Sequence, residues 1–295
     1  MSSITGELTP KGINVAKVFR TIRRWPLAPV AVVLFLIIIA IFAPLVAPHH
    51  PLEAKFEKRN VPPAWTEEGT SEYLLGGDHI GRDILSRIIF GTRISLMVAA
   101  TVLAAGAFVG TVLGVTAGYF GGIVDEILMR MVDFTYAVPF ILVALVAAVI
   151  WDPSLQLVII LLAIFTWPPF ARQVRVETLQ LKAMDYVAMA RVSGASGMRI
   201  AFKHILPGIV PTVMVMASLQ VGALVITESV LSFLGVGIPA PDPSWGSMVS
   251  QGRNYVATAW WISFFPGVAI FLIVFSMNFL GDWLRDTLDP KLRQL

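Results

Sequence analysis

The sequence has 295 residues, of which 56% are hydrophobic and only 14% are charged, and its mean hydropathy is +0.77. Soluble domains contain about 25% charged residues, so this composition excludes an ordinary soluble domain. The net charge of +3 indicates basic cytoplasmic loops rather than nucleic-acid binding, and the absence of cysteine excludes disulfides, thiolate metal sites and a cysteine nucleophile.

A polar segment, residues 1–25, precedes an apolar run at residues 26–47. A signal peptide has a core of only about 7–15 apolar residues and a shorter polar leader. We therefore expect the run to be a retained first transmembrane helix. A polar loop of mixed charge, residues 48–93, follows it.

Five further apolar runs lie at about residues 94–117, 131–150, 155–170, 208–233 and 260–283. A helix needs roughly 20 apolar residues to cross a bilayer. The runs are continuous and do not alternate with period two, which favours helices over a β-barrel. The sequence thus predicts an all-α integral membrane protein with about six transmembrane helices. Residues 94–284 form its core of five, with a polar loop at 171–207 and a tail at 285–295.

Small and aromatic residues refine this prediction. Gly106, Gly110, Gly114 and Gly118 recur every four residues, which predicts a ridge that another helix approaches closely. We also expect an aromatic belt at the ends of the spans, formed by tryptophans 151, 167, 245, 260, 261 and 283.

The distribution of basic residues predicts the orientation. With the N-terminus in the cytoplasm, 15 of the 22 lysines and arginines lie inside and 7 lie outside. The positive-inside rule then places both termini and the 171–207 loop in the cytoplasm, and the 48–93 loop outside.

Three patterns bear on chemistry. The sequence has no phosphate-binding P-loop motif, so we expect no ATPase activity and no cofactor of its own. The adjacent His49 and His50 are expected to be solvated rather than to bind a metal. The GASG sequence at 194–197, with His204 nearby, resembles the Gly-x-Ser-Gly of intramembrane serine proteases, but Ser196 lies in a basic loop and not inside the membrane.

Glu228 lies well inside the fifth apolar run. An acid at this depth is typical of an ion-coupled secondary transporter, or of a residue that contacts substrate or a partner subunit. It is equally typical of a structural carboxylate that is hydrogen-bonded to a neighbouring helix.

The 171–207 loop contains the most informative motif. Its second half predicts a short helix, a glycine turn at Gly194 and a second short helix, and Pro207 suits the start of the next span. It resembles the EAA loop of ABC importer permeases, matching at Ala190, Gly194, Leu206 and Pro207. It departs from that pattern at Ala188, where the family has Glu, and at His204, where it has Ile.

The resemblance covers most of the chain. Residues 76–96, 118–140, 228–253 and 281–293 are similar to the second permease subunit of dipeptide and oligopeptide importers. The resemblance implies a type I ABC importer permease in the bacterial inner membrane, in contact with membrane lipid. It further implies three kinds of partner: a homologous permease, two cytoplasmic ATPases that bind ATP and Mg²⁺, and an extracytoplasmic substrate-binding protein.

The family also implies site residues. Those expected to contact an ATPase are Tyr186, Val187, Ala188, Ala190, Arg191, Gly194, Ala195, Ser196 and Arg199. Substrate-path candidates are Glu228 and, in the 241–245 loop, Asp242 and Trp245. The expected cargo is a di- or oligopeptide, although this subunit type also serves glutathione, nickel, opine and oligosaccharide importers.

Overall fold

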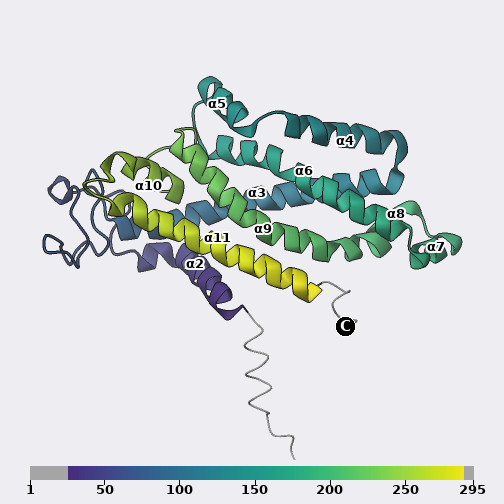
Figure 1. Ribbon diagram of the computed structural model, residues 1–295, viewed down its shortest axis with the longest axis horizontal. Coiled ribbons are helices and arrows are strands. Elements are labelled where there is room, and N and C mark those ends of the chain that lie inside the picture. Colours follow the sequence, from purple (N-terminus) through teal and green to yellow (C-terminus); the bar gives the residue numbers. More distant parts are fainter. Residues whose placement is uncertain (1–25, 289–295) are drawn as a thin grey trace, which may run out of the picture.

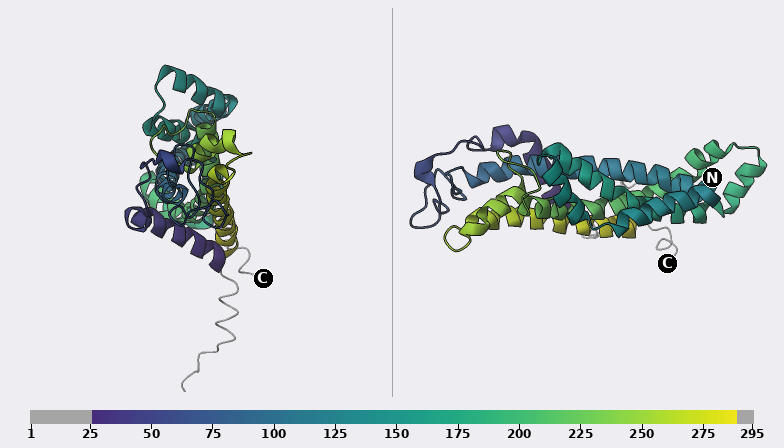
Figure 2. Two further views of the ribbon diagram at one scale, coloured as in Figure 1. Left: turned by 90° about the vertical axis from the view of Figure 1, so that its left-hand side faces the viewer. Right: turned by 90° about the horizontal axis from the view of Figure 1, so that it is seen from above.

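The computed structural model describes residues 26–288, which form an elongated bundle of helices (Figures 1 and 2). No β-strand occurs in this part of the chain. The expected polar segment 1–25 and the end of the tail, 289–295, lie outside the described residues. The elements in chain order are α2 (Leu27–Val46), η1 (Phe56–Lys58), α3 (Ile84–Phe120), α4 (Gly122–Ala137), α5 (Phe140–Ile150), α6 (Leu155–Lys182), α7 (Asp185–Val192), α8 (Gly197–Ile200), η2 (Ala201–Ile205), α9 (Leu206–Phe233), α10 (Trp245–Gly252), η3 (Arg253–Tyr255) and α11 (Trp261–Leu288).

Five helices are long and apolar enough to cross a membrane: α2, α3, α6, the continuous stretch through α9, and α11. The pair α4 and α5 makes a sixth span if the two are counted together, with a bend of 77° between them. The third apolar run, 131–150, is therefore not one continuous helix. Pro139 causes the break, because its ring disfavours helical backbone at the preceding Val138, which is extended at φ −94° and ψ 120°.

Two further boundaries differ from the prediction. Helix α3 begins ten residues earlier than expected, because the Asp83 side chain accepts a hydrogen bond from the backbone N–H of Ser86 and caps the helix there. Helix α6 runs on through Pro168 and Pro169 to Lys182 instead of ending at residue 170. Packing of its buried C-terminal half against α3 outweighs the backbone hydrogen bonds that the prolines remove.

The glycine ridge of α3 is confirmed. Each of its four glycines lies directly against α6, and a Cβ atom added there would come within 2.5–2.6 Å of an α6 atom. The α6 residues that the four glycines would strike are, in order, Thr166, Phe170, Ala171 and Thr178. This close approach makes α3 and α6 the central pair of the bundle (Figure 1).

The tryptophan belt is only partly as expected. Trp167 lies in the middle of α6 rather than at a span end, because the helix continues past it. Trp245 is fully buried, and its indole N–H donates to the backbone carbonyl of Ile88 at 3.2 Å. Trp151 and Trp261 lie where α5 ends and α11 begins.

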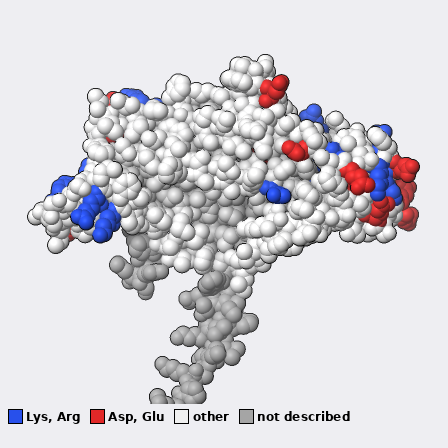
Figure 3. All heavy atoms as spheres, turned by 180° about the vertical axis from the view of Figure 1, so that it is seen from behind, with Lys and Arg blue, Asp and Glu red and all other residues white. Residues whose placement is uncertain are grey.

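Charged side chains are concentrated toward the two ends of the bundle (Figure 3). On the face shown, Lys and Arg gather at the end formed by α7 and α8, both signs occur at the opposite end, and most of the surface between is uncharged. The long axis of the bundle is therefore the direction in which it crosses a bilayer.

A buried ion cluster holds the end opposite α7 and α8. Asp78 accepts from Arg87 and, at 2.6 Å, from Nε of Arg82, and Arg82 reaches Gln251 of α10 at 3.0 Å. Burial opposes ionisation of Asp78, but the charge of Arg87 and hydrogen bonds from Arg82 hold its pKa below the ordinary value. The cluster ties the 47–83 loop to α3 and α10.

Candidate functional site

The first candidate site is the α7–α8 hairpin, residues 185–200, at the end of the bundle where basic residues gather. Gly194 has φ +80°. The backbone N–H of Gly194 donates to Arg191 O at 3.0 Å, and that of Ala195 donates to Ala190 O at 3.1 Å. These two bonds are the Schellman pattern that ends a helix with a left-handed glycine. The predicted first helix and glycine turn are thus confirmed. The second helix is not a separate short one, because α8 continues through η2 into α9 as one helical stretch, residues 197–233.

The inner side of the hairpin is anchored to the bundle. Val187 and Ile200 are buried with Val174, Ile205 and Ile209, and Ala190 and Ala195 pack against this cluster. Contact between the third residue from the helix end and the residue after the glycine commonly accompanies a Schellman motif. Val187, Ala190 and Ala195 therefore hold the hairpin in place, and they are not available to a partner to the same extent as its outer residues.

The outer side of the hairpin is open to solvent. It carries the expected residues Tyr186, Ala188, Arg191, Ser196 and Arg199, all exposed. It also carries three apolar side chains that were not expected: Met189 (70% exposed), Val192 (90%) and Met198 (63%). The spacing of Met189 and Val192, three residues apart on one helix face, is the sequence signal that would have identified them.

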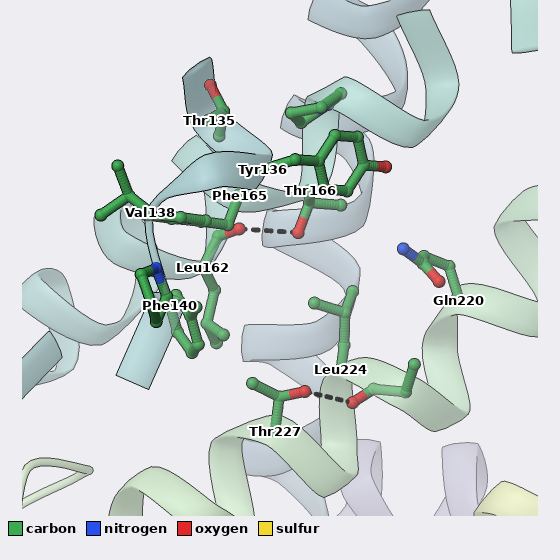
Figure 4. A pocket seen from close by; sticks show the side chains of 13 residues that line it. Thr135, Tyr136, Val138, Phe140, Leu162, Phe165, Thr166, Gln220, Leu224 and Thr227 are labelled. Carbon is green, nitrogen blue, oxygen red and sulfur yellow. Dashed lines mark hydrogen bonds between the residues drawn. The ribbon is translucent and has the colours of Figure 1, made fainter. Parts of the chain in front are cut away.

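The second candidate site is a cavity of about 330 Å³ beside the break between α4 and α5 (Figure 4). It lies between that break, α6 and α9. Its walls combine aromatic and aliphatic side chains with a few polar groups, and no lining residue is charged. The lining residues are Thr135, Tyr136, Val138, Pro139, Phe140, Leu162, Phe165, Thr166, Pro168, Gln220, Ala223, Leu224 and Thr227.

The polar groups of the cavity differ in their availability. The hydroxyls of Thr166 and Thr227 donate to carbonyls of their own helices, at 2.6 and 2.7 Å (Figure 4). The amide of Gln220 and the hydroxyl of Tyr136 make no hydrogen bond among residues 26–288, so they can bind another partner. Next to Tyr136, the Arg172 guanidinium lies 4.9 Å from the ring centroid and donates to Asp133 at 2.7 Å, which fastens α6 to α4.

Sequence reasoning did not identify this cavity. Gln220, an amide within an apolar span, was the available signal. The helix break that creates the cavity was missed, because Pro139 was included in a single continuous run.

The structure places the three substrate-path candidates away from the cavity. Glu228 is buried between α9 and α10, where its Oε1 accepts from Ser232 at 2.8 Å and from Ser244 at 3.0 Å. Ser244 also caps α10. Asp242 is exposed in the loop before α10, and Trp245 is buried. The other oxygen of Glu228, Oε2, is buried and has no hydrogen-bond partner among residues 26–288. The contacts of Oε1 are structural, and a role of these residues in the substrate path stays a prediction.

The other motifs receive structural explanations. The Ser196 hydroxyl accepts the backbone N–H of Arg199 at 3.4 Å and caps α8, which accounts for a serine in the GASG sequence. His49 lies 3.4 Å from Asp83 and edge-on to Tyr73, and His50 accepts a backbone N–H from Leu52.

Comparison with solved structures defines the class. The MetNI methionine ABC transporter, in inward-facing conformations, matches with a TM-score of 0.58 at 21% identity, over 70% of this chain and 98% of that one. This likeness concerns the fold alone, and it confirms the type I ABC importer permease fold.

Comparison of sequences then gives the family. Residues 110–294 match the model of the binding-protein-dependent transport system inner membrane component, and residues 17–63 match the N-terminal TM domain of oligopeptide transport permease C. The chain therefore belongs to the family of inner-membrane permeases of binding-protein-dependent transport systems, which are transport proteins and not enzymes. It is a multi-pass membrane protein.

Relatives with assigned functions cover nearly the whole chain. The dipeptide transport system permease protein DppC of Haemophilus influenzae is 38% identical over 89% of both chains. The glutathione transport system permease protein GsiD of Pectobacterium atrosepticum is 43% identical over 88% of this chain and 85% of its own. DppC of Bacillus subtilis is 37% identical over 91% of this chain and 82% of its own.

Proposed function

We propose that this chain forms half of the translocation path of an ATP-driven importer of di- or oligopeptides. The observation that carries the proposal is the α7–α8 hairpin, which is anchored on its inner side and presents exposed apolar and basic side chains at one end of a membrane-spanning bundle. Exposed apolar groups gathered in a solvated protrusion indicate a protein-binding surface. Dipeptide permeases among the relatives support peptides as the cargo.

The hairpin suits contact with an ATPase. Its Schellman turn and buried inner side make it a stiff extension of α6 and α9, so a force on its outer side is transmitted to both helices. ATP and Mg²⁺ would bind to two partner ATPases in the cytoplasm. The hairpin and both termini would lie on that side, and the 47–83 loop would face an extracytoplasmic substrate-binding protein.

The cavity suits the passage of a peptide. It is of a size used by small-ligand sites and offers an amide and a phenol hydroxyl among apolar walls, which match peptide groups without selecting a side-chain charge. Because it opens beside the break between α4 and α5, movement of α4 against α6 would change its shape. A homologous permease would close its open side.

The test concerns the outer side of the hairpin. Val192→Asp places a charge on the most exposed apolar residue of the hairpin, where no buried contact is lost. We expect normal membrane insertion but at least tenfold weaker co-purification with the cognate ATPases, and loss of ATP-dependent peptide uptake. The matched control is Gln180→Asp, which adds the same charge at an exposed position of α6 outside the hairpin. Equal ATPase binding by the two variants would refute the assignment.

A further inference from the structure

Arg172 of α6 is in direct contact with the polar wall of the peptide cavity. Its guanidinium lies 4.9 Å from the ring centroid of Tyr136 and donates to Asp133 of α4 at 2.7 Å. Tyr136 lines the cavity, and so does Pro168, which precedes Arg172 by one turn of α6. These contacts place a charged pair immediately beside a cavity whose own lining is uncharged.

The Asp133–Arg172 pair is exposed, although it lies well inside the spans. From the start of α4 at Gly122 to Asp133 is about 17 Å at 1.5 Å per residue. From Arg172 to the end of α6 at Lys182 is about 15 Å. The side chains of Asp133 and Arg172 are 58% and 52% exposed. Charged groups at such a depth face a water-filled path or a partner and not lipid, so the pair lies on the side of α4 and α6 where the cavity opens.

A role in stability alone does not account for this pair. An ion pair that is exposed to this extent contributes little to the stability of a fold. A less exposed pair already joins α4 to α6: both Nε and Nη2 of Arg175 donate to the carboxylate of Asp125, the second at 2.6 Å. Arg172 differs from Arg175 in that it also lies over the ring of a cavity residue.

The contact fixes the direction of the Tyr136 side chain. The hydroxyl of Tyr136 makes no hydrogen bond among residues 26–288, so the cation on its ring is the polar contact that holds it. Figure 4 shows this hydroxyl directed toward the side of the cavity where the Gln220 amide lies. A positive charge beside the ring also favours the hydroxyl as a hydrogen-bond donor, which is the role required to bind a carbonyl oxygen.

We propose that Arg172 is a positioning residue for peptide passage, which holds Tyr136 so that its hydroxyl donates to a backbone carbonyl of the peptide. This inference rests on the proposed function. It makes the peptide contact depend on the contact between α4 and α6: when the helices separate, Asp133 leaves Arg172, the ring is released and the peptide loses this hydrogen bond. Because every peptide has backbone carbonyls, the site selects the peptide backbone and not a side chain.

The test is the number of peptides taken up per ATP hydrolysed, measured with the complete importer in proteoliposomes at saturating peptide-loaded binding protein. A peptide that is poorly held in the cavity escapes while ATP is still consumed. Tyr136→Phe and Arg172→Gln should each lower this ratio about two- to tenfold, the effect of one lost hydrogen bond between neutral groups. The double variant should be no worse than either single one, and Arg172→Lys, which keeps a cation at this position, should retain most of the parent ratio.

Arg175→Gln is the matched control, because it removes the other ion pair between α4 and α6 without touching the cavity wall. It should lower the temperature of thermal unfolding more than Arg172→Gln does, yet keep the parent ratio of uptake to ATP hydrolysis. Equal ratios in Arg172→Gln and Arg175→Gln would overturn the inference. So would a parent ratio in Tyr136→Phe, or effects of the two single variants that multiply in the double variant. In each of these cases the parent still takes up peptide with ATP, so the proposed function stands, whereas a parent without such uptake would refute the proposed function itself.

Discussion

Substitution of Gly194 best distinguishes a hairpin that binds an ATPase from a hairpin that only connects α6 to α9. Its φ of +80° lies in the left-handed region, and a Cβ atom there would meet nothing within 4 Å. A substitution is therefore opposed by the backbone alone and not by a clash. A left-handed conformation costs an ordinary residue about 1–2 kcal/mol, and a β-branched side chain lies toward the upper end of about 1–3 kcal/mol.

This magnitude predicts a graded effect. If the ATPase binds the hairpin only in the present conformation, Gly194→Ile should lower its affinity about 5- to 140-fold, since 1.4 kcal/mol corresponds to a factor of ten. Gly194→Asn is the matched control. It also adds a side chain, but asparagine tolerates the left-handed region, so its affinity should stay within a few-fold of the parent.

The assay is a binding titration of purified ATPase subunits on the permease in nanodiscs, together with ATP-dependent uptake. Expression and membrane insertion should be unchanged, because the spans carry the stability and Gly194 is exposed. If Gly194→Ile binds and couples as well as Gly194→Asn, then the hairpin is only a connector and the reasoning fails.

Three further predictions follow from the fold. Gly110→Val should destabilise the protein by about 1–3 kcal/mol or more, because the added Cβ would lie 2.5 Å from the Cβ of Phe170. The control is Gly267→Val on α11, where an added Cβ would meet nothing within 4 Å, so this variant should be tolerated. Thermal unfolding in detergent measures both. Asp78→Asn should lower the free energy of unfolding by about 3–5 kcal/mol, because it breaks the buried ion cluster. The folded pKa of Asp78 is depressed, so the stability that its charge provides in the parent should be lost as the pH falls below about 4. Cysteines placed at the exposed Ser71 and Ser193 in the cysteine-free chain should react with membrane-impermeant reagents from opposite sides of oriented vesicles, and same-side labelling would contradict the topology.

The features that the sequence predicted well are those with a local physical cause. Hydropathy alone located α2, α9 and α11, because an apolar run in lipid has only the helix available. The four glycines of α3 identified the close contact with another helix, and Gly194 identified the hairpin turn, because both signals depend on the absence of a Cβ atom.

The features that were missed depend on tertiary context. Whether a proline breaks a helix cannot be read from its presence: α6 continues through Pro168 and Pro169, whereas the chain bends at Pro139. The difference is packing, because the residues after Pro169 are buried against α3 and those around Pro139 border a cavity. Glu228 could be read as functional or structural from the sequence, and only the positions of Ser232 and Ser244 reveal its partners.

The most direct test of the central claim is uptake of a labelled dipeptide by proteoliposomes that contain this chain, its homologous permease, the ATPases and the binding protein. The account predicts uptake that requires ATP on the hairpin side and the binding protein on the other. It also predicts that uptake is abolished by Val192→Asp while Gln180→Asp leaves it intact. Uphill uptake by this chain alone, driven by a proton or sodium gradient without ATP, would contradict the account.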